Sequence, residues 1–277
     1  MADNKTWVGD DSGNEGDWSV AANWSPSGVP VATDHVRIPA SSSEDITAGL
    51  NQSAVALGDV IVEKGYTGTI GTSAGYLQID PNRFQFEGTG ESYIDLGSAA
   101  IDVLILDTAT APATGQHGLY LKGSAIAILS VLDGDVAVAG LHGETATVTT
   151  ARTVGDRAKL TLGAGVTLTN LDTVKGEATL RCACTTIDVL GGQLTTEEVG
   201  AITTLNVRDG TAYPNSTGTI TTLNLHGGTV DLTGSGLART ITTLVHNGGA
   251  ILYDPASVTI TNKSAPDAPV RMSATPA

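Results

Sequence analysis

One short pattern occurs three times near the end of the chain. It reads ITTLNVRDGTAY from Ile202 to Tyr213, ITTLNLHGGTVDL from Ile220 to Leu232, and ITTLVHNGGAILY from Ile241 to Tyr253. The copies begin 18 and 21 residues apart, and each continues from I-T-T-L into a short apolar run that glycine interrupts. Self-similarity at a period of about 20 residues is typical of a solenoid, in which each repeat forms one coil.

The pattern continues upstream with decreasing similarity. CTTIDVLGGQL begins at Cys184, IAILSVLDGDV at Ile126 and LGDVIVEKGYTGTI at Leu57. One unit is too short to bury its apolar face alone, whereas stacked units pair their backbones and align their Ile, Leu and Val side chains. We therefore predict an all-β fold, a right-handed parallel β-solenoid (β-helix) of about ten coils, roughly 45–50 Å long. The alternative is an antiparallel β-sandwich with coincidentally similar strands.

Each residue type of the repeat has an expected place in the coil. Threonine at the intervening strand positions is expected to face outward, where a β-branched polar residue suits the pleat. Alternate strand residues share a face, which puts these side chains in the interior stack: Leu205, Val207, Leu223, Leu225 and Leu244. Tight corners often need a left-handed backbone, which assigns these glycines to corners: Gly191, Gly192, Gly227, Gly228, Gly248 and Gly249.

The composition agrees with this fold class. The chain has 277 residues, among them 39 Thr and 34 Gly, with 16% charged and 4% aromatic residues. Thr and Gly are both poor in helix interiors, which excludes a helical protein. Abundant Val, Ile and Leu exclude a disordered chain, and glycine lacks the strict three-residue period of collagen.

Two segments differ from the repeats. Residues 1–45 contain all three tryptophans, Trp7, Trp18 and Trp24, together with Pro30. The end of a solenoid must be protected from edge pairing, so we predict that this segment is an N-terminal cap that also carries the attachment residues. The solenoid is expected over residues 46–261. Residues 262–277 are rich in Pro and Ala and are expected to form an extended C-terminal tail.

The charge is strongly acidic and unevenly distributed. The formal net charge is −15, and residues 1–60 carry nine carboxylates against two basic residues. An acidic surface repels phosphate groups and anionic lipid, so we expect neither a nucleic-acid nor a membrane partner. The sequence shows no basic-then-apolar signal peptide and no run of 18 apolar residues, so we expect folding in the cytoplasm.

Metal or redox chemistry has three candidate signals, each with a simpler reading. Cys182 and Cys184 form a lone C-x-C without a second ligand pair, so we expect small, reduced, buried thiols. The acidic stretch DDSGNEGD from Asp10 to Asp17 does not fit an EF-hand loop, and a solvated turn is the preferred interpretation over a looser calcium site. The histidines have no spaced acidic or Cys partners and are expected at solvent-facing corners: His35, His117, His142, His226 and His246.

Paired carboxylates are the feature to test for a glycosidase or lyase, because β-helices often host such enzymes. Asp flanking a corner glycine is an ordinary turn former, and aromatic platforms for sugar rings are scarce outside the cap. We therefore expect no enzyme activity, no catalytic residues and no cofactor. The candidate pairs are Asp102 with Asp107, Asp133 with Asp135, and Glu197 with Glu198.

The opening WVGDDSGNEGDWSVAANWSPSGVPVATDHVRIP, the stretch LGDVIVEKGYTGTIG and the ITTLNLHGGTVDL repeat together resemble proteins encoded by tailed phages and prophages. The resemblance covers nearly the whole chain. The W-S-x-x-x-N-W opening from Trp18 to Pro30 also resembles the start of large secreted β-solenoid adhesins, which are far longer and carry a signal peptide.

The phage resemblance implies a non-enzymatic virion structural protein, and within that class a head decoration (cement) protein. Such proteins are commonly trimeric and sit on the capsid exterior. It implies the major capsid protein and further copies of the chain as partners, in a virion assembled in the host cytoplasm. The alternatives are a tail fibre or tailspike module that binds host glycan, and a fragment of a bacterial surface adhesin. The resemblance carries over no catalytic residue.

Overall fold

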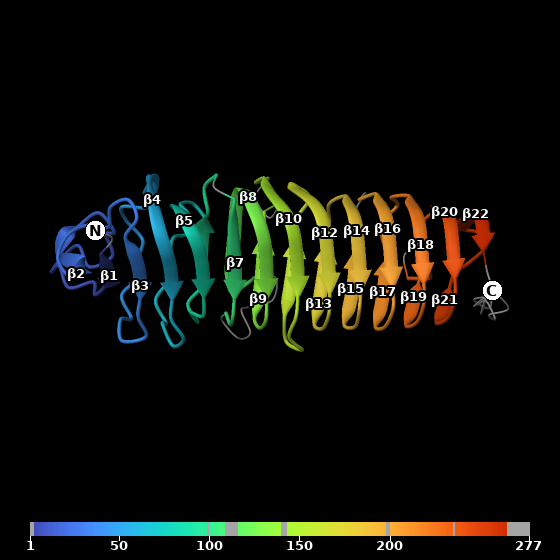
Figure 1. The fold of residues 1–277 in the computed structure, drawn as a ribbon, viewed down its shortest axis with the longest axis horizontal. Coiled ribbons are helices and arrows are strands. Elements are labelled where there is room, and N and C mark those ends of the chain that lie inside the picture. Colours follow the sequence, from blue (N-terminus) through green and yellow to red (C-terminus); the bar gives the residue numbers. More distant parts are fainter. Residues whose placement is uncertain are drawn as a thin grey trace.

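The chain forms a long, regular rod in a computed structural model that describes residues 3–98, 100–108, 116–139, 143–197, 200–234 and 236–264. These ranges contain 22 strands and one short 3-10 helix, η1 (Ala21–Asn23). The strands build a parallel β-solenoid of about 11 turns, drawn side-on in Figure 1. The predicted fold class is confirmed, and the antiparallel sandwich is excluded. No helix in the described ranges is long and apolar enough to cross a membrane.

Two stacks of strands make up the coils. One stack runs the full length of the rod: β1 (Asn4–Trp7), β3 (His35–Ile38), β4 (Asn51–Val62), β5 (Leu77–Phe86), β7 (Ile101–Ile105), β8 (Leu119–Val131), β10 (Ala146–Thr153), β12 (Val166–Thr173), β14 (Cys184–Val189), β16 (Ile202–Val207), β18 (Ile220–Leu225), β20 (Arg239–His246) and β22 (Val258–Ser264). The other stack pairs through β8 and contains β6 (Ser92–Asp95), β9 (Asp135–Val138), β11 (Lys159–Leu162), β13 (Glu177–Leu180), β15 (Gln193–Thr196), β17 (Thr211–Pro214), β19 (Thr229–Asp231) and β21 (Ala250–Leu252). Strand β2 (Trp24–Ser25) pairs antiparallel with β1.

An apolar column passes through the first stack. Leu205 lies opposite Leu223, and Leu223 lies opposite Leu244 in the next coil. In each preceding coil the residue paired with this position is also apolar, and the column ends at Val36 near the N-terminus. The five leucine and valine side chains expected inside are each 0% exposed: Leu205, Val207, Leu223, Leu225 and Leu244. Burial of this column in every coil supplies the apolar driving force for the fold.

The neighbouring inner column contains a polar exception. Val207 lies opposite Leu225, and Leu225 lies opposite His246, which is 0% exposed. The expectation of a solvent-facing histidine is therefore wrong for His246, because the register puts it at an inward strand position. His117 is also half-buried rather than solvent-facing, whereas His35 and His226 are exposed. His142 lies outside the described residues.

The corners follow the Gly-Gly pairs. The second glycine of each pair has a left-handed backbone, with φ of 63° at Gly192, 66° at Gly228 and 77° at Gly249. A Cβ on Gly228 would lie 2.5 Å from the carbonyl oxygen of Gly210 in the preceding coil. Close stacking of the corners and their backbone angle therefore both require glycine at this position.

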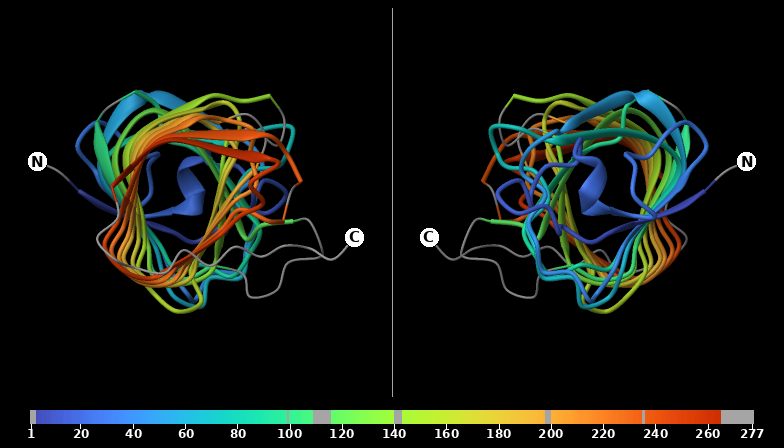
Figure 2. Two further views of the ribbon diagram at one scale, coloured as in Figure 1. Left: turned by 90° about the vertical axis from the view of Figure 1, so that its right-hand side faces the viewer. Right: turned by 90° about the vertical axis from the view of Figure 1, so that its left-hand side faces the viewer.

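The tryptophans pack together at the N-terminal end. Trp24 contacts Trp7 and Trp18 edge to face, with ring centroids 5.1 and 4.6 Å apart, and its Nε1 donates to the Trp18 carbonyl oxygen at 2.8 Å. All three are at most 2% exposed, and Pro30 is buried. Seen from this end, η1 lies across the mouth of the first coils (Figure 2). Parallel pairing begins with β1 and β3, within residues 1–45.

A lysine stands at each end of the apolar column. Lys5 lies opposite Val36, and its Nζ donates to the carbonyl oxygens of Pro26 and Ser27 at 3.2 and 3.5 Å. Lys263 lies opposite Leu244 and donates to the Tyr253 hydroxyl at 3.2 Å. Strand β22 runs to Ser264, so the predicted tail from 262 begins within a strand, and residues 265–277 lie outside the described ranges.

Replacing one residue of the apolar column should destabilise the whole rod. We expect Leu223→Ala to lower the free energy of unfolding by about 2–5 kcal/mol, because it leaves a cavity between two tightly packed coils. Urea unfolding followed by circular dichroism measures the change. The control is Thr222→Ala on the outer side of the same strand, which should cost less than about 1 kcal/mol. Equal losses in the two variants would contradict the inside–outside assignment.

Candidate functional site

Three tyrosines from successive coils form a column on the outside of the rod. Tyr93 lies opposite Tyr120, and Tyr76 precedes Leu77, which lies opposite Ile94. Leu77 and Ile94 belong to the core, so the tyrosines before them point outward, since successive strand residues face opposite sides. The rings form a separate apolar cluster with Ala137. We call Tyr76, Tyr93 and Tyr120 the tyrosine column.

The rings of the column contact one another directly. Tyr93 and Tyr120 are stacked, with centroids 4.6 Å apart and planes at 3°, and Tyr76 meets Tyr93 edge to face at 5.5 Å. Such pairs contribute about 0.5–1.5 kcal/mol beyond their buried area. Each ring is no more than 8% exposed, although the column lies outside the core. Other side chains must therefore cover it.

Lys122 and Glu144 cover one end of the column. The Lys122 Nζ lies 4.3 Å from the centroid of the Tyr76 ring, a cation–π contact. The Tyr76 hydroxyl donates to Oε2 of Glu144 at 2.9 Å, which joins residues 68 positions apart in the sequence. The segment that precedes β10 therefore folds back along the rod over several coils.

A polar hollow of about 550 Å³ opens beside this cover. Lys122 Nζ lies 3.7 Å from Asp95 Oδ2 and 3.9 Å from Glu144 Oε1, so one ammonium faces two carboxylates. Small hydroxyl side chains supply further donors and acceptors. The polar lining includes Ser53, Asp80, Asp95, Lys122, Ser124 and Glu144. Fixed polar groups around a hollow of this size suit a ligand with several hydroxyl groups.

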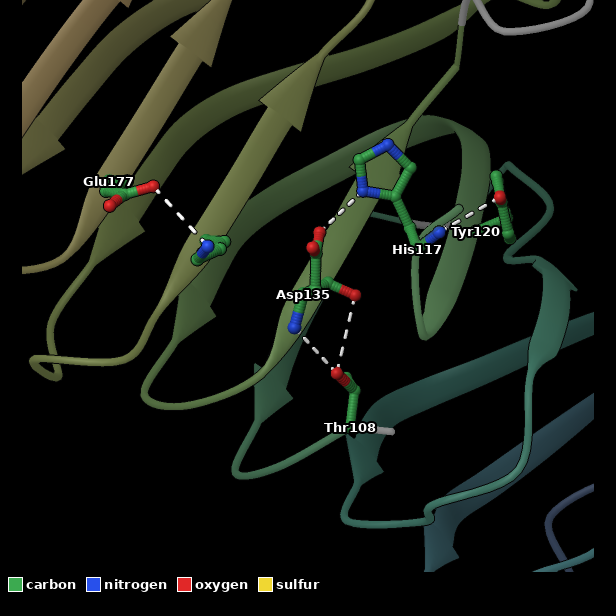
Figure 3. A network of polar contacts seen from close by, with 6 residues as sticks. Thr108, His117, Tyr120, Asp135 and Glu177 are labelled. Carbon is green, nitrogen blue, oxygen red and sulfur yellow. Dashed lines mark hydrogen bonds and ion pairs between the residues drawn. The ribbon is translucent and has the colours of Figure 1, made fainter. Parts of the chain in front are cut away.

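A second polar network lies at the other end of the column (Figure 3). Nδ1 of His117 lies 2.5 Å from Oδ1 of Asp135, and the backbone N–H of His117 donates to the Tyr120 hydroxyl at 3.0 Å. The backbone N–H of Asp135 donates to Thr108 Oγ1 at 2.7 Å. On the neighbouring strands Lys159 pairs with Glu177 at 3.7 Å. The network joins His117, just before β8, to Asp135 at the start of β9.

The His117–Asp135 pair resembles two members of a catalytic triad, but the third member is not found in the described chain. A triad needs a Ser, Thr or Cys within hydrogen-bond reach of the histidine. Among the residues described, the histidine ring bonds only to Asp135, and Thr108 is fully buried and bonded to the Asp135 backbone. The contacts of the pair therefore position His117 against β9.

The carboxylate pairs singled out in the sequence are dispersed. Asp133 caps its own turn through the Gly134 N–H at 2.8 Å and contacts Arg157, whereas Asp135 turns to His117. Glu197 pairs with Arg181 at 2.8 Å, and its sequence neighbour Glu198 lies outside the described residues.

Asp107 and Asp102 also have different surroundings. Asp107 accepts a bond from the Thr108 N–H at 2.9 Å, whereas Asp102 is exposed on β7. Across the residues that the structure covers, these pairs form no shared site.

Neither thiols nor acidic residues assemble a metal site. Cys182 and Cys184 are free and buried, as expected, and burial raises the pKa of each thiol to about 12. Such thiols are not reactive near neutral pH, because the thiolate is the nucleophile. In the acidic turn, the Asp11 carboxylate accepts a hydrogen bond from the Asn14 side-chain amide at 2.9 Å. The Asp17 carboxylate accepts one from the Ser19 hydroxyl at 2.6 Å. The parts of the chain described contain no group of three or more His, Cys, Asp or Glu side chains arranged to hold a metal ion.

Comparison with known proteins does not identify the chain. No family description, no curated protein and no solved structure matches the chain.

The tyrosine column should make stability fall at alkaline pH. Burial first, and then neighbouring carboxylates, raise the pKa of Tyr76 and of Tyr93 above the usual value of about 10. A phenol whose pKa is raised by folding stabilises the folded state fully below the unfolded pKa, and this contribution is lost as pH rises above about 10. We expect the free energy of unfolding to fall between about pH 9 and pH 11.5.

The matched variant is Tyr93→Phe, which removes one of these phenols and should make the fall less steep. Urea titrations at each pH measure both slopes, and phenolate absorbance reports the ionisation directly. Equal slopes in the variant and the original protein would contradict the assigned pKa shift.

Proposed function

We propose that the chain is a non-enzymatic virion structural protein, a decoration (cement) protein that binds and stabilises the head shell of a tailed phage, as a homotrimer. The resemblance of its opening and repeats to phage-encoded proteins supports this class. The observation that carries the proposal is the contrast between a uniform rod with a largely apolar core and one specialised end. A rod of this kind is stiff and soluble and needs no disulfide, which suits assembly in a cytoplasm.

The N-terminal end offers the surface for attachment. A groove of about 560 Å³ crosses the outer faces of β1, β3 and β4. In it Arg37 contacts Glu63, and the Asp59 backbone N–H donates to Nδ1 of His35 at 3.0 Å. Arg37 and His35 have side chains that are 61% and 50% exposed, so they are accessible to a partner.

The charge of this end supports the same role. Residues 1–60 carry nine carboxylates and two basic residues, so this fifth of the chain contributes nearly half of the net charge of −15. Charged groups around an interface speed up encounter and suppress wrong partners. Many weak contacts of this kind, repeated by the symmetry of a shell, give strong total binding.

Electron microscopy of virions that contain the protein tests the proposal. We expect density for the rod on the head surface, with the N-terminal end toward the shell. Arg37→Glu should lower the occupancy of the rod on shells tenfold or more at limiting protein, because reversal of a charge in a contact costs several kcal/mol and each 1.4 kcal/mol is about a tenfold change in affinity. Arg152→Glu, on the middle of the rod, is the matched control and should leave occupancy unchanged. Density only at the tail tip, or full occupancy with Arg37→Glu, would contradict the assignment.

A second candidate function is binding of host glycan, favoured by the polar hollow beside the tyrosine column. Carboxylates, an ammonium and hydroxyls gather there as they do around sugar hydroxyl groups. If host polysaccharide fragments bind in the hollow, Lys122→Met should raise their Kd about tenfold, since a charge-assisted hydrogen bond is lost. Calorimetry measures this, with Lys159→Met as the control. Absence of binding by the unmodified protein would remove this candidate.

A further inference from the structure

One side of the rod is covered by a regular array of threonines. Two outward-facing residues, separated by one inward residue, recur in seven successive coils from β10 to β22. Twelve of the fourteen positions are Thr and two are Ala. We call this the threonine face; its members are Thr147, Thr149, Thr167, Thr169, Ala183, Thr185, Ala201, Thr203, Thr219, Thr221, Thr240, Thr242, Thr259 and Thr261.

The array is held in register by the backbone. Thr147 lies opposite Thr167, and Thr240 lies opposite Thr259. Between these pairs the backbone ladder continues. The Cys184 N–H donates to the Ala201 carbonyl oxygen at 2.9 Å, and the Ile202 N–H donates to the Thr219 carbonyl oxygen at 3.0 Å. The end-on views show these coils lying nearly over one another (Figure 2).

The inward residues make the face rigid. The residue between each outward pair is an apolar side chain or a thiol that belongs to the core over most of the face. A threonine side chain is stiff about its first torsion, so its hydroxyl and methyl groups keep fixed directions. The inward residues are Val148, Leu168, Cys184, Ile202, Ile220, Ile241 and Ile260.

The hydroxyl groups of this face are available to water. Thirteen of the fourteen residues are exposed, and Thr242 is half-exposed. None of the twelve threonine hydroxyls is hydrogen-bonded to another residue in the described ranges. The spacing is about 4.8 Å from coil to coil and about 6.7 Å between the two outward residues of a coil. The face is therefore a two-dimensional lattice of free hydroxyl and methyl groups.

The chemistry of the face excludes most ligands. None of the fourteen positions is charged, although the chain carries a net charge of −15, so phosphate groups find no cation there. None is aromatic, so sugar rings find no stacking platform. What the face does present is hydroxyls that hold water by hydrogen bonds and methyls that order the water around them.

We propose that the threonine face binds ice. Oxygen atoms on exposed planes of hexagonal ice repeat at distances close to both spacings of the face, so ordered water held on the threonines continues into the crystal lattice. Each contact is weak, but a rigid array makes them all at once without further loss of conformational freedom. This inference stands on the threonine face alone and is independent of the proposed function.

The test is partition of the purified full-length chain into slowly growing ice, together with inhibition of ice recrystallisation. We expect the protein to enter the ice fraction and to keep ice crystals small. Thr203→Lys, in the centre of the face, should lower incorporation at least about tenfold, because a long charged side chain separates the lattice from the ice. Thr179→Lys, on the second stack of strands, is the matched control and should keep the activity.

Circular dichroism and the melting temperature establish that both variants are folded. Exclusion of the unmodified protein from ice would overturn the proposal. So would equal incorporation of the two variants. Sedimentation of the same samples identifies the competing occupant: if Thr203→Lys dissociates an oligomer while ice is unaffected, the face binds a second copy of the chain, and the ice proposal is wrong.

Discussion

Parallel pairing of the backbone between successive coils sets the position of every strand side chain along the rod. Each strand residue is hydrogen-bonded to the ladder at a spacing of about 4.8 Å, so a residue type repeated at the same position becomes a column along the rod. Apolar repeats produce the inner column that contains Leu205 and Leu223. Outside, the same rule produces the tyrosine column and the threonine face. Three surfaces of different chemistry therefore arise from one backbone constraint.

The repeats between Cys184 and Tyr253 could be interpreted from the sequence because their coils are nearly equal in length. The I-T-T-L start and the Gly-Gly corner mark both ends of the first strand, so inward and outward positions follow by alternation. Even the error at His246 had a signal in the sequence. Alignment of the Gly-Gly pairs puts His226 opposite Asn247, and the side chains of these two residues are 3.4 Å apart in the structure. The same alignment puts His246 opposite Leu225, which faces inward.

The tyrosine column could not be found in the same way. Tyr76, Tyr93 and Tyr120 are 17 and 27 residues apart, and the loops between them differ in length. Each tyrosine precedes Leu or Ile and then a polar residue, but this three-residue pattern is too short to align the three positions. Nor does spacing reveal that Glu144 returns to Tyr76. These contacts depend on how the loops fold over the rod, which is a tertiary property.

Some buried polar groups lie inside a core that is otherwise apolar. The hydroxyls of Thr153 and Thr173 lie in an inner column, opposite one another, and have no hydrogen-bond partner. Arg239 is 4% exposed, its two terminal nitrogens are unpartnered, and burial lowers its pKa to about 10. An unsatisfied buried polar group costs about 1–3 kcal/mol, and more when it is charged. Each of these groups therefore offsets part of the stability that the apolar columns supply, in the middle of the rod as well as near its C-terminal end.

The lysines at the two ends of the apolar column bear on how long such a rod can become. An uncapped solenoid is a template onto which another solenoid can stack, and repeated stacking gives fibres. With Lys5 at one end and Lys263 at the other, end-to-end stacking of two molecules would bring two ammonium groups together in line with an apolar column. Polymerisation is therefore disfavoured by charge repulsion and desolvation. Charge at both ends of the column thus favours separate rods over fibres.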